Sequence, residues 1–130
     1  MSLLKENISF VVVCYKSSAA LKSLLISIPK ELEVVLVDNS NDKETSEIAN
    51  SYDCTLIQNQ ENIGYGAACN LGAEKASGTY LLFINPDSEL KPETLNELIK
   101  AADNYPNVSA FNPKIIGRSG KQSFKRRSVL

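Results

Sequence analysis

Two acidic residues at the ends of apolar segments are the first candidates for chemistry. Asp87 follows an apolar run of strand length and stands in the tripeptide Asn85-Pro86-Asp87, while Asp38 ends an earlier apolar run. Pro86 cannot donate a hydrogen bond within a sheet, so the strand must stop near Asn85 and leave Asp87 on a loop. Open α/β sheets hold their ligands at such strand ends, although an ordinary Asx-Pro turn is the commoner use of this tripeptide.

The composition restricts the chemistry that these acids can support. The 130 residues contain no histidine, which excludes a Ser-His-Asp triad, a histidine base and histidine metal ligands. Cys14, Cys54 and Cys69 are odd in number and widely spaced, so they fit neither a disulfide framework nor a zinc site, and we expect reduced, mostly buried thiols. Any metal must therefore be held by oxygen, which indicates Mg²⁺ or Mn²⁺.

The elements that position these residues follow from the spacing of apolar side chains. Strand-length runs alternate with stretches of helical period, and the third run alternates more than the others, so it is expected nearer an edge. The predicted strands are 8–14, 33–38, 54–59 and 79–84, with short strands at 108–111 and 114–116, and the strand 79–84 is expected to be buried. The apolar stripes of the predicted helices are Leu21/Leu24/Leu25/Ile28, Thr45/Ile48/Ala49/Tyr52 and Leu95/Leu98/Ile99/Ala102. This order predicts an α/β domain of three layers, a mostly parallel sheet with helices on both faces.

A glycine-rich segment, residues 62–73, lies before the strand that leads to Asp87. Small residues at the amino end of a helix suit an anion site, because free N–H groups and the helix dipole both face the ligand. Close packing of a helix on a sheet needs small residues too, and the two interpretations stand about even. Gly64-x-Gly66 is not a dinucleotide fingerprint, because the third glycine is misplaced. We expect Gly78 to end the helix in a left-handed cap and a serine near Ser17 to begin the first helix.

The charge is unevenly distributed along the chain. Residues 114–130 contain six basic residues and no acid, whereas residues 1–113 contain eight basic and fifteen acidic residues. We therefore separate a domain of residues 1–116 from a basic hairpin or flexible tail of residues 117–130. The acidic domain and the lack of aromatics interleaved with basic residues argue against nucleic acid. The apolar runs are too short to span a membrane and the start lacks signal-peptide features, so the expected location is cytoplasmic.

Four motifs, taken together, resemble a known family. Val-Val-Val-Cys-Tyr-Lys at 11–16, Val-Val-Leu-Val-Asp-Asn-Ser at 34–40, the segment 62–72 and Leu-Phe-Ile-Asn-Pro-Asp at 82–87 occur in the order and spacing of family 2 glycosyltransferases of the GT-A fold, most like the rhamnosyltransferase-type branch. The resemblance covers nearly the whole chain and implies the Rossmann-like fold of nucleotide-diphospho-sugar transferases. It implies an enzyme that transfers a sugar from a UDP- or dTDP-sugar, with inversion, to a glycan or lipid-linked acceptor.

The resemblance also implies roles for individual residues. The base and ribose would lie beside Cys14, Tyr15 and Lys16, and uracil or thymine would donate a hydrogen bond to Asp38, which Asn39 follows. The floor under the ribose and diphosphate would be lined by Asn62, Gly64, Gly66 and Asn70. The metal that bridges the phosphates would be bound by Asp87 with Asn85. Two positions depart from the family pattern. Asn85 replaces the first aspartate of an Asp-x-Asp motif, and Lys16 replaces the usual asparagine.

The resemblance leads us to expect that the catalytic base lies outside these 130 residues. An inverting transfer needs an Asp or Glu across the sugar from the leaving group, and the family places it well downstream of Asp87. The later acids, Glu89, Glu93, Glu97 and Asp103, are poor candidates because they stand beside the donor site. We therefore expect the donor-binding half of a glycosyltransferase, truncated at the C-terminal side.

Six basic residues at a chain end are most commonly an ordinary solvated tail. The resemblance adds an alternative, because the family acts on lipid-linked acceptors and the basic cluster 125–127 resembles a basic segment of this branch, which implies a peripheral contact with the inner face of the membrane. Two alternatives stay open. One is a non-catalytic α/β module that binds a nucleotide or a protein, and the other is a nucleotidyltransferase, which is less favoured because no glycine-rich, arginine-containing loop follows the first strand.

Overall fold

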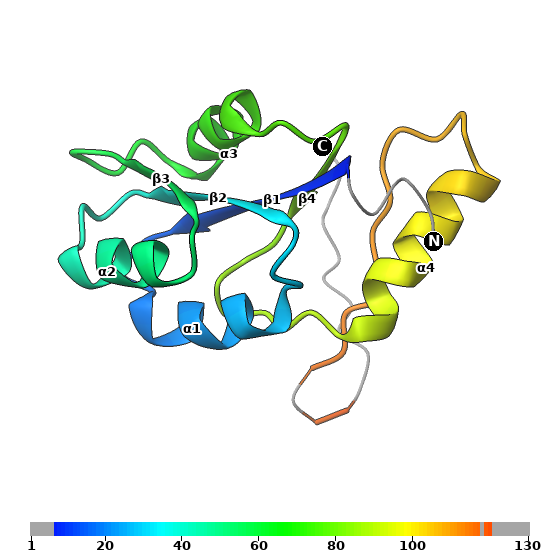
Figure 1. The fold of residues 1–130 in the computed structure, drawn as a ribbon, viewed down its shortest axis with the longest axis horizontal. Helices are drawn as coiled ribbons and strands as arrows, with labels where there is room; N and C mark the ends of the chain where they lie inside the picture. Colours follow the sequence, from blue (N-terminus) through cyan, green and yellow to red (C-terminus); the bar gives the residue numbers. More distant parts are fainter. Residues whose placement is uncertain (1–6, 118, 121–130) are drawn as a thin grey trace, which may run out of the picture. The chain divides into compact units, whose positions relative to one another are not determined.

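The computed structural model describes residues 7–117 and 119–120, and within them strands and helices alternate (Figure 1). The strands are β1 (Ile8–Cys14), β2 (Glu33–Asp38), β3 (Thr55–Gln58) and β4 (Tyr80–Phe83), and the helices are α1 (Ser18–Ser27), α2 (Lys43–Ser51), α3 (Tyr65–Lys75) and α4 (Pro92–Asn104). The chain divides into a compact unit of residues 1–92 and a second unit of residues 93–130.

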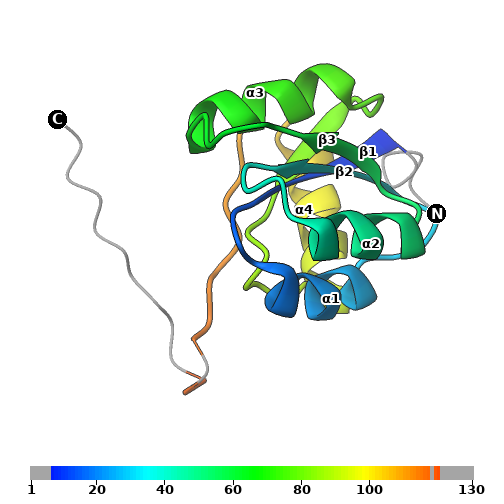
Figure 2. The ribbon, with the colours of Figure 1, turned by 90° about the vertical axis from the view of Figure 1, so that its left-hand side faces the viewer.

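The sheet of the first unit is parallel throughout, with strand order β3-β2-β1-β4. Helix α3 packs on one face of β1 and β2, while α1 and α2 contact each other on the other face (Figures 1 and 2). This arrangement confirms the predicted three-layer α/β fold and the edge position of β3. As their runs of apolar residues predicted, β1 and β2 are covered on both faces, and Phe10, Val12 and Leu36 have no exposed surface.

A polar cluster at the amino end of the sheet holds the start of β4 against β1 and β2. The Glu33 carboxylate accepts hydrogen bonds from Ser9 Oγ at 2.7 Å, Ser77 N at 2.8 Å and Ser77 Oγ at 2.8 Å. Ser9 Oγ in turn accepts a hydrogen bond from Gly78 N at 2.8 Å. A side chain at Gly78 would come within 2.7 Å of the Asn7 carbonyl oxygen, so glycine is required by close approach.

The same cluster corrects the predicted role of Gly78. Gly78 does not have a positive φ, and the helix before it ends at Lys75 with Ala76 in an extended conformation. The Ala76 N–H donates to the Gly72 carbonyl oxygen, which closes the helix without a left-handed residue. Ser17 stands at the N-cap of α1 without a side-chain capping bond, since its hydroxyl donates to the Tyr15 carbonyl oxygen instead.

The Glu33 cluster makes stability depend on pH. Burial alone would raise the pKa of Glu33, but the hydrogen bonds from Ser77 and Ser9 outweigh it and hold this pKa below its ordinary value of 4.5. A carboxyl with a lowered pKa stabilises the fold above pH 4.5, and this contribution is lost as the pH falls through the lowered value. We expect Glu33→Gln to lose part of this pH dependence in urea denaturation above and below pH 4.5. Glu31→Gln, which alters an exposed acid, should keep the wild-type profile.

Two expectations about strands are wrong. β4 is a sheet edge within the described residues and is not buried, because Tyr80, Leu81 and Phe83 are 41%, 38% and 46% exposed. The predicted strands at 108–111 and 114–116 do not form, and only Ile116 makes an isolated bridge. Pro113 removes a backbone donor in that segment, and a strand needs a partner along its length to satisfy its peptide groups.

Helix α4 begins at Pro92, the last residue of the first unit, and continues into the second unit with Glu93 in its first turn, as predicted. Leu95 and Ile99 are its buried residues. Among the described residues, no helix is long and apolar enough to cross a membrane. The basic cluster 125–127 lies outside the described residues, as does most of the predicted tail.

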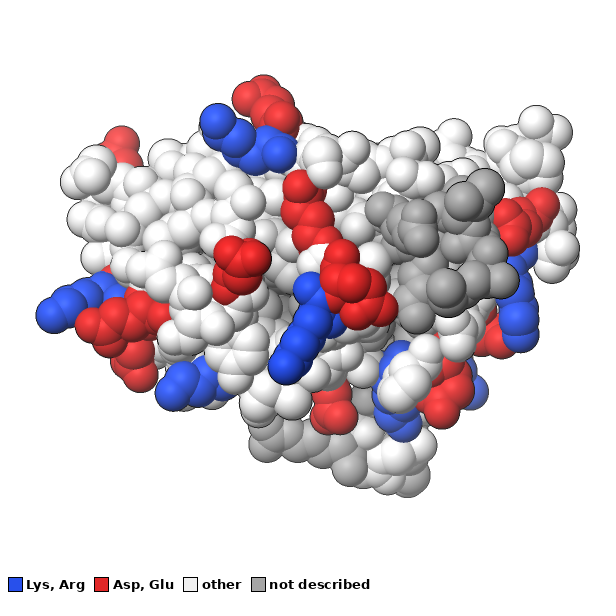
Figure 3. Space-filling view, in the orientation of Figure 1, with Lys and Arg blue, Asp and Glu red and all other residues white. Residues whose placement is uncertain are grey.

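Charged side chains on the face drawn in Figure 3 are interspersed, with acidic and basic groups side by side. Two ion pairs lie within helices, Lys43–Glu47 at 3.8 Å in α2 and Lys100–Glu97 at 2.9 Å in α4. All four side chains are at least 66% exposed, so each pair adds little to stability, about 0.3–0.5 kcal/mol.

Candidate functional site

The carboxyl ends of the four strands meet at one edge of the sheet. Cys14 of β1 is paired with Asp38 of β2, and Asp38 is paired with Gln58 of β3. On the other side of β1, Phe83 is paired with Val11, and a hydrogen bond of 3.2 Å from Ile84 N to the Val11 carbonyl oxygen continues this pairing. The loop that contains Asp87 therefore begins at the same edge as the ends of β1, β2 and β3. This is the edge at which open α/β sheets bind ligands.

Asp38 is fully buried at this edge, and its carboxylate is saturated with donors. Oδ1 accepts Ser40 N at 2.9 Å and Ser40 Oγ at 2.6 Å, and Oδ2 accepts Asp42 N at 2.7 Å and Gln58 Nε2 at 3.3 Å. Burial alone would raise the pKa of Asp38, but these hydrogen bonds outweigh it and place the pKa below its ordinary value of 3.8. Asp38 is therefore a charged group that shapes the loop between β2 and α2.

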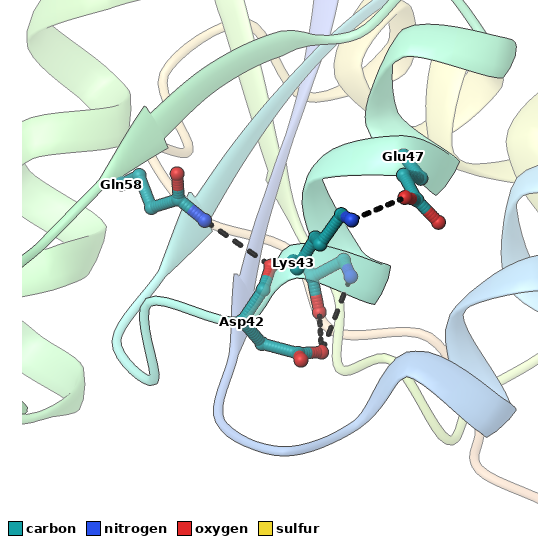
Figure 4. Close-up of polar contacts among 5 residues, drawn as sticks. Asp42, Lys43, Glu47 and Gln58 are labelled. Atoms are coloured by element: carbon teal, nitrogen blue, oxygen red, sulfur yellow. Dashed lines mark hydrogen bonds and ion pairs between the residues drawn. The ribbon is translucent and has the colours of Figure 1, made fainter.

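Asp42 and Gln58 complete this loop (Figure 4). Asp42 begins α2, because its carboxylate accepts hydrogen bonds from Thr45 N at 3.1 Å and Thr45 Oγ1 at 2.8 Å. The Gln58 side chain extends from the end of β3 and donates through Nε2 to the Asp42 carbonyl oxygen at 3.1 Å. The end of β3 is thus joined to the start of α2 through a single exposed side chain.

The first predicted site segment, residues 14–16, divides into a buried and an exposed part. Cys14 has no exposed surface, and burial, together with the charge of Asp38, raises the pKa of its thiol to about 12. The Cys14 thiol therefore stays protonated at neutral pH, and it lies below the surface of this edge. Tyr15 is 50% exposed, and Lys16 Nζ lies 5.3 Å from the centre of the Tyr15 ring. The Lys16 backbone has φ +49° and donates to Ser40 Oγ at 3.1 Å, which joins the loops after β1 and β2.

Asn39 is a further predicted contact residue that the structure buries. It is 4% exposed, and its Nδ2 donates to the Gly64 carbonyl oxygen at 3.2 Å. Its Oδ1 accepts a hydrogen bond from Asn59 Nδ2 at 2.8 Å. Asn62, which is exposed, accepts Gly64 N at 2.9 Å through its side chain. Two asparagines therefore hold Gly64 in place, the buried Asn39 through the Gly64 carbonyl oxygen and the exposed Asn62 through the Gly64 backbone N–H.

The glycines of this segment fall into two kinds. Gly64 has φ +87°, and beyond the adjoining backbone no described atom lies within 4 Å of the place where a side chain would begin at Gly64 or Gly66. Gly72 is different, because a Cβ there would collide with Val11 Cγ1. The packing interpretation of the small residues is therefore correct at Gly72, and the anion-site interpretation stays a prediction for Gly64 and Gly66. The carboxyl half of α3 packs on the sheet, and its amino end faces open space. Asn70 is an exposed residue of α3.

This difference predicts opposite effects of two alanine substitutions. At Gly66 an added methyl group contacts no neighbouring side chain, and alanine is favoured over glycine within a helix. Gly66→Ala should therefore stabilise the fold by about 0.5–1 kcal/mol. Gly72→Ala forces a methyl group into Val11 and should destabilise the fold by about 1–3 kcal/mol. Urea denaturation measures both. A destabilising Gly66→Ala would show that the amino end of α3 is packed rather than open.

The loop after β4 presents two oxygen-bearing side chains. Asn85 and Asp87 are exposed on either side of the buried Pro86, and Ser88 N donates to the Asn85 carbonyl oxygen at 3.0 Å. Within the part of the chain that the structure describes, no group of three or more Cys, Asp or Glu side chains is arranged to hold a metal. Mg²⁺ commonly uses one or two carboxylates and takes its other ligands from phosphates and water. One exposed carboxylate beside an amide oxygen fits that kind of site.

Four residues that organise this edge were missed by sequence reasoning. They are Ser40, Asp42, Gln58 and Asn59. Ser40 and Asp42 had a local signal, because both follow Asp38 closely in a polar turn where an aspartate commonly accepts backbone hydrogen bonds. Gln58 and Asn59 bond to residues about twenty positions away, and no local pattern announces such contacts.

Comparisons with known proteins agree with this geometry. The sequence profile described as "Glycosyl transferase family 2" matches residues 9–129. The chain is 31% identical, over 88% of its length, to the low-salt glycan biosynthesis hexosyltransferase Agl10 of Haloferax volcanii, and it covers 38% of that protein. This chain therefore spans about a third of the curated relatives that it matches.

Solved structures share the fold. Staphylococcus aureus TarS, residues 1–349, superposes with a TM-score of 0.68 at 25% identity, over 83% of this chain and 39% of that one. The mannosyltransferase PcManGT of Pyrobaculum calidifontis, solved with GDP-Man and Mn²⁺, has a TM-score of 0.67 at 22% identity, over 74% of this chain and 32% of that one. At 22% identity, the likeness to this mannosyltransferase shows a shared fold. With a profile match over nearly the whole chain and the motifs gathered at one edge of a parallel sheet, this protein belongs to glycosyl transferase family 2.

Proposed function

We propose that this chain carries the donor-binding part of a glycosyltransferase, and that it binds a nucleotide diphosphate sugar together with Mg²⁺ or Mn²⁺. The observation that carries the proposal is the arrangement at one sheet edge of Asp38, the open amino end of α3 and the exposed Asp87. A base, a diphosphate and a metal ion need three such partners side by side. The mannosyltransferase PcManGT was solved in complex with a ligand set of this kind, GDP-Man and Mn²⁺.

Each part of the donor has a partner in the proposal. The exposed Tyr15 and Lys16 flank the nucleoside, and Asp38 accepts a hydrogen bond from the ring N–H of uracil or thymine, which makes the donor a UDP- or dTDP-sugar. Gly64 and Gly66 allow the diphosphate to approach the amino end of α3, where N–H groups and the helix dipole favour an anion.

The proposed metal site is the loop after β4. Asp87 and Asn85 would hold the ion through oxygen, and the ion would offset the negative charge that the diphosphate gains as the sugar leaves. The acceptor site and the catalytic base, an Asp or Glu, are proposed for the part of the longer relatives that this chain does not cover. The function proposed for these 130 residues is therefore binding and orientation of the donor.

A thermal-shift panel tests the proposal. UDP, dTDP, GDP and ADP are each added with Mn²⁺, with Mn²⁺ and EDTA, or without metal. We expect UDP or dTDP with Mn²⁺ to stabilise the protein most, by about 2.7 kcal/mol at 100 times the dissociation constant. Equal shifts with all four nucleotides would remove the role given to Asp38, and no shift with any of them would contradict donor binding.

A further inference from the structure

The hydrogen bonds of Asp38 conflict with a direct role in binding a base unless one of its donors leaves. Its carboxylate accepts four hydrogen bonds and the residue has no exposed surface. A carboxylate offers about four lone-pair positions, so an incoming ring N–H must replace an existing donor. The identity of the displaced donor then helps to determine which base is accepted.

Three of the four donors are fixed by the loop that they build. Ser40 N and Asp42 N are backbone groups of the turn between β2 and α2. Ser40 Oγ makes the shortest bond, 2.6 Å, and also accepts Lys16 N, so it holds two loops together. Gln58 differs on each point, because its donor belongs to an exposed side chain and its bond to Asp38 Oδ2 is the longest at 3.3 Å.

Removing Gln58 from this position leaves no acceptor without a partner. Asp38 Oδ2 keeps its bond from Asp42 N at 2.7 Å. The Asp42 carbonyl oxygen, the second acceptor of Gln58, keeps its bond from Ser46 N at 3.1 Å. Because an unpaired buried acceptor is the main cost of breaking such a bond, rotating Gln58 into solvent costs only the net strength of the hydrogen bonds that its carboxamide exchanges for bonds to water.

We propose that the Gln58 carboxamide holds the position on Asp38 Oδ2 that the ring N–H of uracil or thymine takes, and that the base binds by displacing Gln58. A carboxamide presents an N–H next to a carbonyl group, as the imide edge of these two bases does, so the two groups compete for one acceptor. Adenine has no imide N–H, and its exocyclic amino group stands beside a ring nitrogen rather than a carbonyl group, so it does not match the edge that the carboxamide resembles. This inference rests on the proposed function and adds a residue that determines specificity.

Substitutions of Gln58 separate competition from a structural role. Gln58→Ala removes the competing donor, and Gln58→Met removes the donor while keeping the length of the side chain. Gln60→Ala is the matched control, since Gln60 is an exposed glutamine two residues away. Calorimetry with UDP and with ADP, each with Mn²⁺, gives the affinities, and urea denaturation gives the stability of each variant.

We expect both Gln58 variants to bind UDP about two- to tenfold more tightly than wild type, which corresponds to one hydrogen bond, with unchanged ADP affinity and with the control like wild type. UDP affinity that is unchanged or weaker in both variants overturns the inference while leaving the proposed function in place. Absence of UDP binding by the wild-type chain overturns the proposed function and the inference together.

Discussion

Asp87→Asn is expected to abolish the metal-dependent part of nucleotide binding, whereas Asn85→Asp strengthens it. Asp87 is the exposed carboxylate of the loop after β4, and its charge is what an oxygen site offers to Mg²⁺ or Mn²⁺. Mutating a residue that only hydrogen-bonds to a metal ligand typically lowers metal affinity by about 10–100-fold, so removing the charge of the metal ligand itself should lower it at least as much. Asn85→Asp adds a second carboxylate and should act in the opposite direction.

Calorimetric titration of Mn²⁺ in the presence of UDP measures both effects. The control is Glu89→Gln, which removes one negative charge from an exposed position two residues from Asp87. If the control weakens Mn²⁺ as much as Asp87→Asn does, the effect is general electrostatics rather than ligation. If Mn²⁺ affinity is the same in the Asp87 and Asn85 variants as in wild type, this loop is only a turn.

Asp38→Asn is expected to lower the free energy of unfolding by about 2–3 kcal/mol. Each carboxylate oxygen accepts a backbone N–H, Ser40 N at Oδ1 and Asp42 N at Oδ2. The amide group of asparagine must turn its own donor toward one of them, whichever way it is oriented. One buried donor then loses its acceptor, which typically costs about 1–3 kcal/mol, and the remaining bonds lose the charge that strengthens them.

The pH dependence of stability gives a second signature of Asp38. Its pKa is lowered in the folded protein, so the charged form stabilises the fold above pH 3.8 and the contribution disappears as the pH falls through the lowered value. Asp38→Asn should lose this component, and Asp53→Asn, at an exposed position, should retain it. Urea denaturation over this pH range measures both. A variant as stable as wild type at neutral pH would show that the hydrogen bonds of Asp38 contribute little.

The strands at the centre of the sheet were predictable because burial on both faces makes nearly every residue of β1 and β2 apolar. β2, for example, ends at Asp38 as expected. The same logic failed for β4, since its apolar residues suggested burial although it is an edge among the described residues. The segment 108–116 failed because apolar residues alone cannot provide the partner that a strand requires. These differences depend on which strands are neighbours, which no local pattern records.

The motifs predicted that the candidate residues stand at strand ends, and the structure brings these ends to one edge of the sheet, but the residues that support them were not predicted. Tyr15, Gly66 and Asp87 are exposed at or beside this edge, and their contact with a ligand stays a prediction. Cys14, Asp38 and Asn39 belong to the same motifs but are buried, and the hydrogen bonds of Asp38 and Asn39 shape the loops around them. A motif shows that a residue type matters at a position, and it does not show whether the side chain faces the ligand or the loop.

An amide chemical-shift map of the ¹⁵N-labelled chain, recorded as UDP is added with Mg²⁺, tests whether the donor binds at the carboxyl edge of the sheet. We expect shifts at this edge, at Tyr15 and Lys16, at Gly64 and Gly66, and at Asp87. A separate cavity of 290 Å³ lies at the amino ends of β2 and β3, lined in part by Leu25, Val34 and Tyr52. Shifts confined to that cavity, or no shifts at saturating UDP, would contradict the assignment of the donor site.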